Sequence, residues 1–190
     1  MSFTPRLSKS GMLYNPFWYN PQKNIYLRSG DFGLPNCTCY AYGRFYEETP
    51  CFEPPYLMGD GGQWWEVAQE LGLHIGQTPQ LGAVICLGRT DGGAGHVGIV
   101  EQIFDDYIVC SNSGYYRKNG LTPEEYYQTS SYFFLTENYK NDNYLPSGWS
   151  NYYFQGFIYN DNIDIKPTLK TKTHYKWVLY SKMIRRKFFG

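Results

Sequence analysis

The order of hydrophobic and polar positions predicts two helices near the start of the chain. Apolar positions recur at helical spacing from Cys37 to Glu47, where Asn36 is a good N-cap and Thr49-Pro50 ends the pattern. A second helix is predicted from a cap at Asp60 to a terminal Gly72. Its apolar face consists of Trp64, Val67, Ala68 and Leu71.

Four or five strands are predicted after these helices. Residues 83–87 form a short apolar run, and residues 96–104 alternate between apolar and polar positions. Asp105-Asp106 is a turn signal, so residues 107–113 are expected to return as a hairpin partner. Further strands are predicted at 133–135 and 154–159, separated by a long loop rich in Tyr and Asn. Helices followed by strands indicate an α+β fold with N-terminal helices packed on an antiparallel sheet.

Length and charge predict one domain with an appendage. The 190 residues can bury a core without disulfides, and we expect a domain over 1–165. Its first 35 residues are interrupted by Pro and Gly and are expected to form an irregular lead-in (residues 1–35). The formal net charge is zero, yet eight of the 17 basic residues and none of the 17 acidic ones lie in a C-terminal tail, residues 166–190.

The basic tail has three interpretations. Aromatic and apolar residues recur in it at helical spacing among the basic ones, so it could lie on an anionic membrane or wall polymer. It could instead dock onto a partner protein through its aromatic residues, or be a solvated end. Nucleic-acid binding is not expected, because the remaining 165 residues are acidic and would repel phosphate.

Other compositional features narrow the class of protein. Aromatic residues make up 19% of the chain, including 20 Tyr, which indicates a sheet with one solvent-exposed face and an exposed aromatic surface. The five cysteines form no C-x-x-C pair, so reduced thiols are expected rather than a metal site or a disulfide framework. The first 20 residues lack the apolar run of a signal peptide, and no stretch is apolar enough for a membrane span.

Cys37 and His96 form the pattern with the clearest chemical meaning. Cys37 falls in the first turn of its predicted helix, where the free backbone N–H groups favour a thiolate. His96 follows the glycine loop 91–95 and opens a strand, so its ring can face a cleft. A thiol and an imidazole are the minimum set for nucleophilic catalysis by cysteine.

A third residue is expected to orient the imidazole. The predicted hairpin brings residues near 112 alongside His96, and the Asn112 carbonyl oxygen can accept from an imidazole N–H. Ser111 and Ser113 are the weaker alternatives.

Four residues are candidates for the lining of the substrate cleft: Asn36, Trp64, Ser111 and Ser113. Trp64 has core packing as its competing interpretation. Arg44 and Glu47, three residues apart on the first helix, are expected to form a surface pair.

Several segments resemble the CHAP family, the cysteine–histidine amidohydrolases/peptidases, over about residues 30–160. The resemblance is carried by Asn36-Cys37-Thr38-Cys39-Tyr40-Ala41-Tyr42-Gly43-Arg44, residues 77–85, Gly93-Ala94-Gly95-His96-Val97-Gly98-Ile99-Val100-Glu101, residues 110–115 and residues 154–160. It implies a papain-like fold and cleavage of peptidoglycan, at the muramoyl–L-alanine amide or at a stem or bridge peptide bond. In the family pattern Cys37 is the nucleophile, His96 the general base and Asn112 the third member of the triad.

The resemblance also suggests a biological setting. Residues 2–6, 110–115 and 154–160 are similar to lysins of bacteriophages that infect Gram-positive bacteria. This implies either an endolysin, made in the host cytoplasm and released through a holin, or a lysin carried in the virion tail, with phage tail proteins as partners. The alternative is an inactive structural tail or core protein on the same scaffold. No cofactor or metal is expected: some CHAP domains bind calcium before the cysteine, but residues 29–33 contain a single acid.

Overall fold

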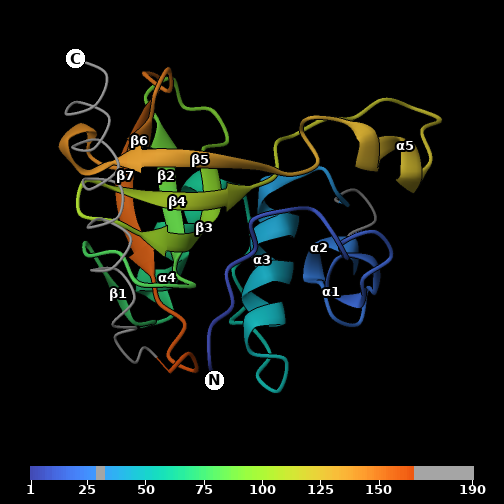
Figure 1. Ribbon diagram of the computed structural model, residues 1–190, viewed down its shortest axis with the longest axis horizontal. Coiled ribbons are helices and arrows are strands. Elements are labelled where there is room, and N and C mark those ends of the chain that lie inside the picture. The colour runs from blue at the N-terminus through green and yellow to red at the C-terminus, as the bar shows by residue number, and fades with distance from the viewer. Residues whose placement is uncertain (29–32, 165–190) are drawn as a thin grey trace, which may run out of the picture.

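The computed structural model describes residues 1–28 and 33–164. Its centre is a seven-stranded antiparallel sheet with the order β1-β7-β2-β3-β4-β5-β6 (Figure 1). The strands are β1 (Ile75–Gly76), β2 (Val84–Arg89), β3 (His96–Ile103), β4 (Tyr107–Asn112), β5 (Phe134–Tyr139), β6 (Leu145–Pro146) and β7 (Tyr152–Ile158). The helices are α1 (Pro16–Tyr19), α2 (Ile25–Arg28), α3 (Cys37–Glu48), α4 (Trp64–Glu70) and α5 (Pro123–Gln128), with the short 3-10 helices η1 (Gly61–Gln63) and η2 (Lys140–Asp142). The predicted α+β fold is confirmed.

Helix α3 lies at the centre of the molecule, between the sheet and the short helices α1 and α2 (Figure 1). It begins where predicted, because the Asn36 Oδ1 accepts hydrogen bonds from the Cys39 N–H at 3.0 Å and from the Thr38 hydroxyl at 2.7 Å. It ends at Thr49, the residue before Pro50. Most of its residues are buried, and this packing holds the helix, with Cys37 at its start, in place.

The lead-in is more structured than the sequence suggested. Asn15 caps α1 by accepting from the Phe17 N–H at 3.0 Å, and Pro16 occupies the first helical position. The buried Trp18 donates its indole N–H to the Tyr40 carbonyl at 3.0 Å. A Cβ at Gly43 would collide with the Trp18 ring, so a glycine is needed where α1 approaches α3. The prediction of an irregular lead-in is therefore wrong for these two helical segments.

Two hydrophobic clusters cover the two faces of the sheet. The larger one joins the helices to the sheet and includes Trp18, Tyr40, Trp64, Val97 and Ile99. The second includes Ile85, Leu87, Val100, Ile108 and Phe157, with aromatic residues from 144–154 packed against it. Strand β6 also contacts β7, so the sheet curls around this second cluster.

Helix α5 and strands β1 and β6 are among the small elements that were not predicted. Helix α5 has a full capping box, in which Thr122 and Glu125 bond each other's backbone, and Pro123 follows the cap. Strands β1 and β6 have two residues each, too few for a visible alternation. Within the described part of the chain, no helix has the length and apolar character that a bilayer crossing requires. The tail prediction, residues 166–190, lies outside the described residues.

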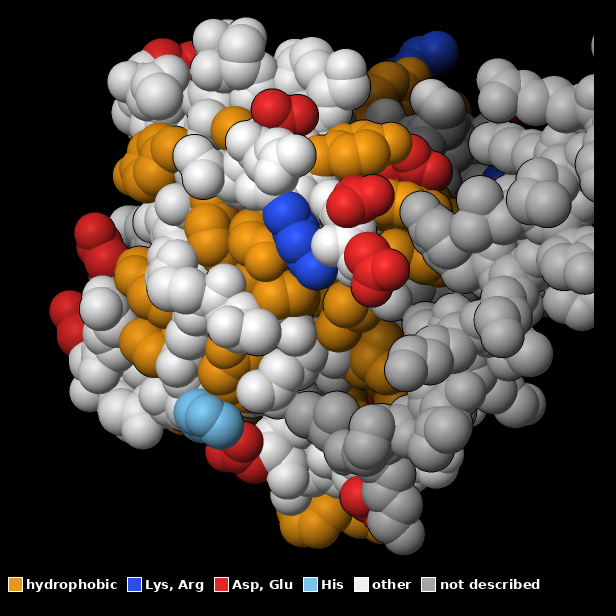
Figure 2. Space-filling view, turned by 60° about the vertical axis from the view of Figure 1, so that its left-hand side comes forward, with side chains coloured by type: hydrophobic (Ala, Val, Ile, Leu, Met, Phe, Trp, Pro, Cys, Tyr) orange, Lys and Arg blue, Asp and Glu red, His pale blue; other side chains and the backbone are white. Residues whose placement is uncertain are grey.

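The molecular surface is rich in aromatic residues. Tyr14, Tyr56, Tyr115 and Tyr153 are among the exposed large side chains. Figure 2 shows hydrophobic side chains, tyrosine included, gathered across one face of the molecule with acidic side chains among and around them. The expected exposed aromatic surface is therefore present.

Candidate active site

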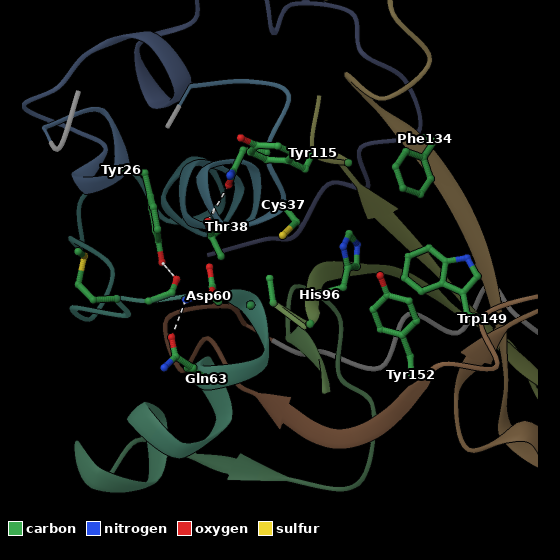
Figure 3. A pocket seen from close by; sticks show the side chains of 17 residues that line it. Tyr26, Cys37, Thr38, Asp60, Gln63, His96, Tyr115, Phe134, Trp149 and Tyr152 are labelled. Carbon is green, nitrogen blue, oxygen red and sulfur yellow. Dashed lines mark hydrogen bonds between the residues drawn. The ribbon is translucent and has the colours of Figure 1, made fainter. Parts of the chain in front are cut away.

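Cys37 and His96 line one cavity of about 720 Å³. Cys37 projects from the first turn of α3, and His96 is the first residue of β3. In Figure 3 the Cys37 side chain lies beside the His96 ring. The structure thus brings together the two residues that the sequence pattern singled out.

The glycine loop before His96 is packed against η1. The Gly62 N–H donates to the Ala94 carbonyl at 2.8 Å, and Gly95 has a φ of +69°. A Cβ at Gly95 would collide with the Gly62 backbone, so this close approach also requires glycine. The contact fixes the start of β3 and, with it, the position of His96.

Asn112 contacts His96 as predicted. The hairpin pairs Ile99 with Ser111, and the His96 Nε2 lies 3.0 Å from the Asn112 Oδ1. The Asn112 Nδ2 donates to the Cys110 carbonyl and to the Thr136 hydroxyl, both at 3.0 Å. Because a carbonyl can only accept, these bonds orient the amide with Oδ1 toward the imidazole. His96 must then donate through Nε2–H, which leaves Nδ1 as the ring atom that can take a proton.

Gly98 makes room for this contact. A Cβ at position 98 would collide with the Asn112 Oδ1. Aromatic rings enclose the imidazole as well: Trp149 lies edge-on at 4.9 Å and Phe134 stacks at 6.4 Å between ring centroids. The ring is 6% exposed, so Asn112 and these aromatic residues hold it in one orientation.

Burial sets the charge state of the pair. Burial raises the pKa of the Cys37 thiol to about 11, although the backbone groups of Val97, Thr38 and Cys37 itself lower it. Burial also lowers the pKa of His96 to about 4, although the hydrogen bond that His96 donates to Asn112 raises it. Without substrate, the site therefore holds a neutral thiol beside a neutral imidazole. The backbone at the start of α3 lowers the pKa of Cys37 in the direction expected, and burial opposes it.

The other residues predicted for the cleft differ in where they lie relative to the cavity. Asn36 lines the cavity next to Cys37. Trp64 does not: it is fully buried in the core and donates its indole N–H to the Tyr26 hydroxyl at 2.7 Å, so its core interpretation holds. Ser113 lies outside the cavity lining and links segments, accepting from the Asn36 N–H and donating to the Ser131 carbonyl, both at 3.2 Å.

Ser111 belongs to a buried charged network behind the site. Its hydroxyl accepts from Tyr40 and donates to Glu101 Oε1, both at 2.7 Å. Glu101 also accepts two bonds of 2.9 Å from Arg44 and one of 2.7 Å from the Arg6 N–H. The network thereby joins α3, β3, β4 and the lead-in.

The expected surface pair on α3 is part of the same network. Arg44 does bind Glu47 at 2.9 Å, but it is buried, and it also pairs with Glu101 and Glu48. The prediction of a surface pair is wrong, because the N-terminal segment around Thr4 and Arg6, together with β3, covers this part of the helix. Burial raises the pKa of Glu48 well above its ordinary value.

Most of the cavity wall comes from residues that the pattern did not single out for the site. They include Tyr26, Met58, Asp60, Gln63, Tyr115, Phe134, Trp149 and Tyr152. Only Asp60 carried a local signal, as a helix cap; the others lie on α2, η1, β5, β7 and the connecting loops. Among the described residues, no three His, Cys, Asp or Glu side chains are grouped so that they could hold a metal ion.

Comparisons with known proteins agree with this site. Residues 28–114 match the family model of the CHAP domain. A Streptococcus mutans serotype c protein described as a hydrolase is 42% identical over 48 residues, which cover 25% of this chain and 22% of that protein. A Staphylococcus aureus protein described as the autolysin LDP is 30% identical over 89 residues, 46% of this chain and 30% of that protein.

One solved structure is similar as well. It is the crystal structure of an N-acetylmuramoyl-L-alanine amidase from Staphylococcus aureus, with 28% identity and a TM-score of 0.37 over 42% of this chain and 23% of that one. This chain spans less than a third of the length of both curated relatives. The matched range contains Cys37, His96 and Asn112, so residues 28–114 of this chain are similar to a CHAP domain.

Proposed function

We propose that this protein is a cysteine hydrolase that cleaves an amide bond in the peptidoglycan of Gram-positive bacteria. The observation that carries the proposal is the cavity that Cys37 and His96 both line, with the tautomer of His96 fixed by Asn112. The CHAP match and the two relatives described as a hydrolase and an autolysin supply the substrate class.

The reaction begins with a proton transfer within the neutral pair. The thiol proton of Cys37 passes to His96 Nδ1 as the sulfur attacks the amide carbonyl carbon. The backbone N–H of Cys37, at the start of α3, is the proposed donor to the oxygen that becomes negative. The imidazolium then gives its proton to the nitrogen of the leaving amine, the C–N bond breaks, and a thioester remains on Cys37.

Hydrolysis of the thioester completes the cycle. His96 Nδ1 takes a proton from water, and the resulting hydroxide attacks the thioester carbonyl. The products are a free amine, a carboxylate and the regenerated thiol. Asn112 does not react; it holds the ring and stabilises the imidazolium that forms in each half of the reaction.

A zymogram on Gram-positive cell wall tests the proposal. Wild type is expected to clear the wall, and Cys37→Ala is expected to lose clearing by at least about 10³-fold, because the nucleophile is gone. Cys51→Ala is the matched control, since Cys51 is exposed and does not line the cavity. Equal clearing by wild type and Cys37→Ala would contradict the enzymatic function and favour an inactive scaffold.

We propose a phage lysin as the biological setting. The support is the sequence resemblance at residues 2–6, 110–115 and 154–160. An endolysin would act from the host cytoplasm, whereas a virion lysin would sit in the tail, with tail proteins or an anionic surface as partners of residues 166–190. Mass spectrometry of purified virions separates the two: stoichiometric copies indicate a tail component, and their absence indicates an endolysin.

A further inference from the structure

The two sides of the cavity differ in chemistry. In Figure 3, Phe134, Trp149 and Tyr152 lie on one side of Cys37 and His96, and Asp60 and Gln63 lie on the other. Among the residues that line the cavity, Asp60 is the one carboxylate, and none is Lys or Arg. The cavity therefore has an aromatic side and a negatively charged side, with the reactive pair between them.

The segment that presents Asp60 is fixed by hydrogen bonds. The Tyr26 hydroxyl donates to the Leu57 carbonyl at 2.7 Å and contacts the Gly59 carbonyl at 3.3 Å. The Asp60 N–H donates to Gln63 Oε1 at 2.9 Å, and the Gln63 N–H returns a bond of 2.9 Å to the Asp60 carbonyl. These bonds fix the backbone from which the Asp60 side chain projects.

Asp60 has no cation beside it in the described part of the chain. The ion pairs found there involve other carboxylates, namely Glu47, Glu48, Glu101, Asp91 and Asp161. Burial is the main cause of the raised pKa of Cys37, and the negative charge of Asp60 adds to it. A carboxylate near a cysteine nucleophile disfavours the thiolate unless a positive group neutralises it.

We propose that Asp60 binds a primary ammonium group of the substrate and thereby selects wall peptides that carry a free amine. The inference rests on the proposed function and names the substrate class of that site. Peptidoglycan offers such amines on the diamino acids of stem peptides that are not cross-linked. An ammonium group donates charge-assisted hydrogen bonds to a carboxylate. Its binding also removes the negative charge that opposes thiolate formation at Cys37.

The test compares purified Gram-positive peptidoglycan before and after N-acetylation with acetic anhydride, which neutralises primary amines. Wild type is expected to lose roughly threefold to tenfold in kcat/KM on the acetylated wall, as a partly exposed ion pair predicts. Asp60→Asn, which keeps a good helix cap, is expected to cleave both walls with a ratio near one. Glu66→Gln removes a charge from the adjacent helix α4 outside the cavity and is expected to keep the wild-type ratio.

Two results would overturn the inference. An unchanged wild-type rate on acetylated wall would show that the amine is not recognised. An equal loss in wild type and Asp60→Asn would place the effect of acetylation elsewhere. Asp60→Ser, a second capping residue, repeats the comparison if the Asn variant does not fold. Failure of wild type to cleave native wall would instead contradict the proposed function.

Alkylation of Cys37 by iodoacetamide tests the charge without any wall. The titratable groups near the thiol are Asp60, His96, Tyr26 and Cys39. Removing the Asp60 charge is expected to raise the alkylation rate at pH 8, because the thiolate fraction rises. Peptide mapping follows Cys37 separately from the exposed Cys51, whose rate should not change. An unchanged Cys37 rate would mean that the Asp60 charge does not act in the cavity, contrary to the proposal.

Discussion

His96 is buried, and Asn112 is its hydrogen-bond acceptor, so the ring carries its proton on Nε2 and is neutral near pH 7. Cys37 is likewise a protonated thiol before substrate binds. A pair of this kind separates charge only when the substrate carbonyl is in place to receive the sulfur. The residues thus define a general-base mechanism rather than a preformed thiolate–imidazolium pair.

The pH dependence of kcat/KM follows from this charge state. Below about pH 4, His96 binds a proton and can no longer serve as the base, so the rate falls. Above about pH 11, Cys37 loses its proton, and none remains for the leaving amine. We expect a plateau between these limits, measured on soluble wall fragments, with circular dichroism at each pH to confirm folding. Because the pair titrates as a unit, an alkaline limb near pH 8 to 9 would instead indicate a preformed ion pair.

Asn112→Ala serves as the internal check on this profile. The Asn112 bond raises the pKa of His96, so its loss should lower that pKa and move the acid limb to lower pH. The same variant should lower kcat roughly tenfold to a hundredfold, because the base loses its orientation while the nucleophile remains. An acid limb that moves to higher pH would contradict the assigned contact.

At the scale of elements, two links join the helix of the nucleophile to the strands of the base. The Asn36 N–H bonds Ser113 near the start of α3, and Arg44 bonds Glu101 further along the same helix. Ser111, in the second link, is the neighbour of Asn112. The relative position of Cys37, His96 and Asn112 therefore depends on contacts outside the cavity.

Glu101→Ala should destabilise the fold strongly. Glu101 is completely buried and accepts bonds from Arg44, Arg6 and Ser111, so its loss leaves the Arg44 charge buried without its main partner. We expect a loss of about 3–5 kcal/mol in the free energy of unfolding, measured by urea denaturation. Asp91→Ala, which breaks an exposed pair with Arg89, should leave the free energy of unfolding nearly unchanged. Similar losses for both variants would contradict the structural role of the network.

The elements also show what local sequence patterns could predict. Helix α3 was predictable because Asn36 caps it and Pro50 ends it, both within a few residues. The His96–Asn112 contact was predictable because a tight hairpin sets the strand register. The burial of Arg44 was not predictable, because the residues that cover it, Thr4, Arg6 and Glu101, are distant in sequence.

At the scale of the whole molecule, the curl of the sheet completes the cavity. Trp149 and Tyr152 lie far from Cys37 in sequence but line the same cavity, because β7 pairs with β2 next to β3. Such long-range pairing leaves no local periodicity in the sequence, so the aromatic wall of the cavity was not predicted. Trp64, which follows the predicted helix cap, was instead listed as a cleft candidate. The cavity as a whole, rather than the triad, contains the groups that can select a substrate.

The most direct test of the central claim is mass spectrometry of purified Gram-positive peptidoglycan digested by wild type and by Cys37→Ala. Wild type is expected to release fragments with one new amine and one new carboxylate per cut, and Cys37→Ala is expected to release none above the buffer control. A new amine on L-alanine would identify the muramoyl amide as the bond cut, and amines elsewhere would identify a stem or bridge peptide bond. Release of the same fragments by Cys37→Ala, or no release by the folded wild-type protein, would contradict the claim that Cys37 and His96 form a wall-cleaving site.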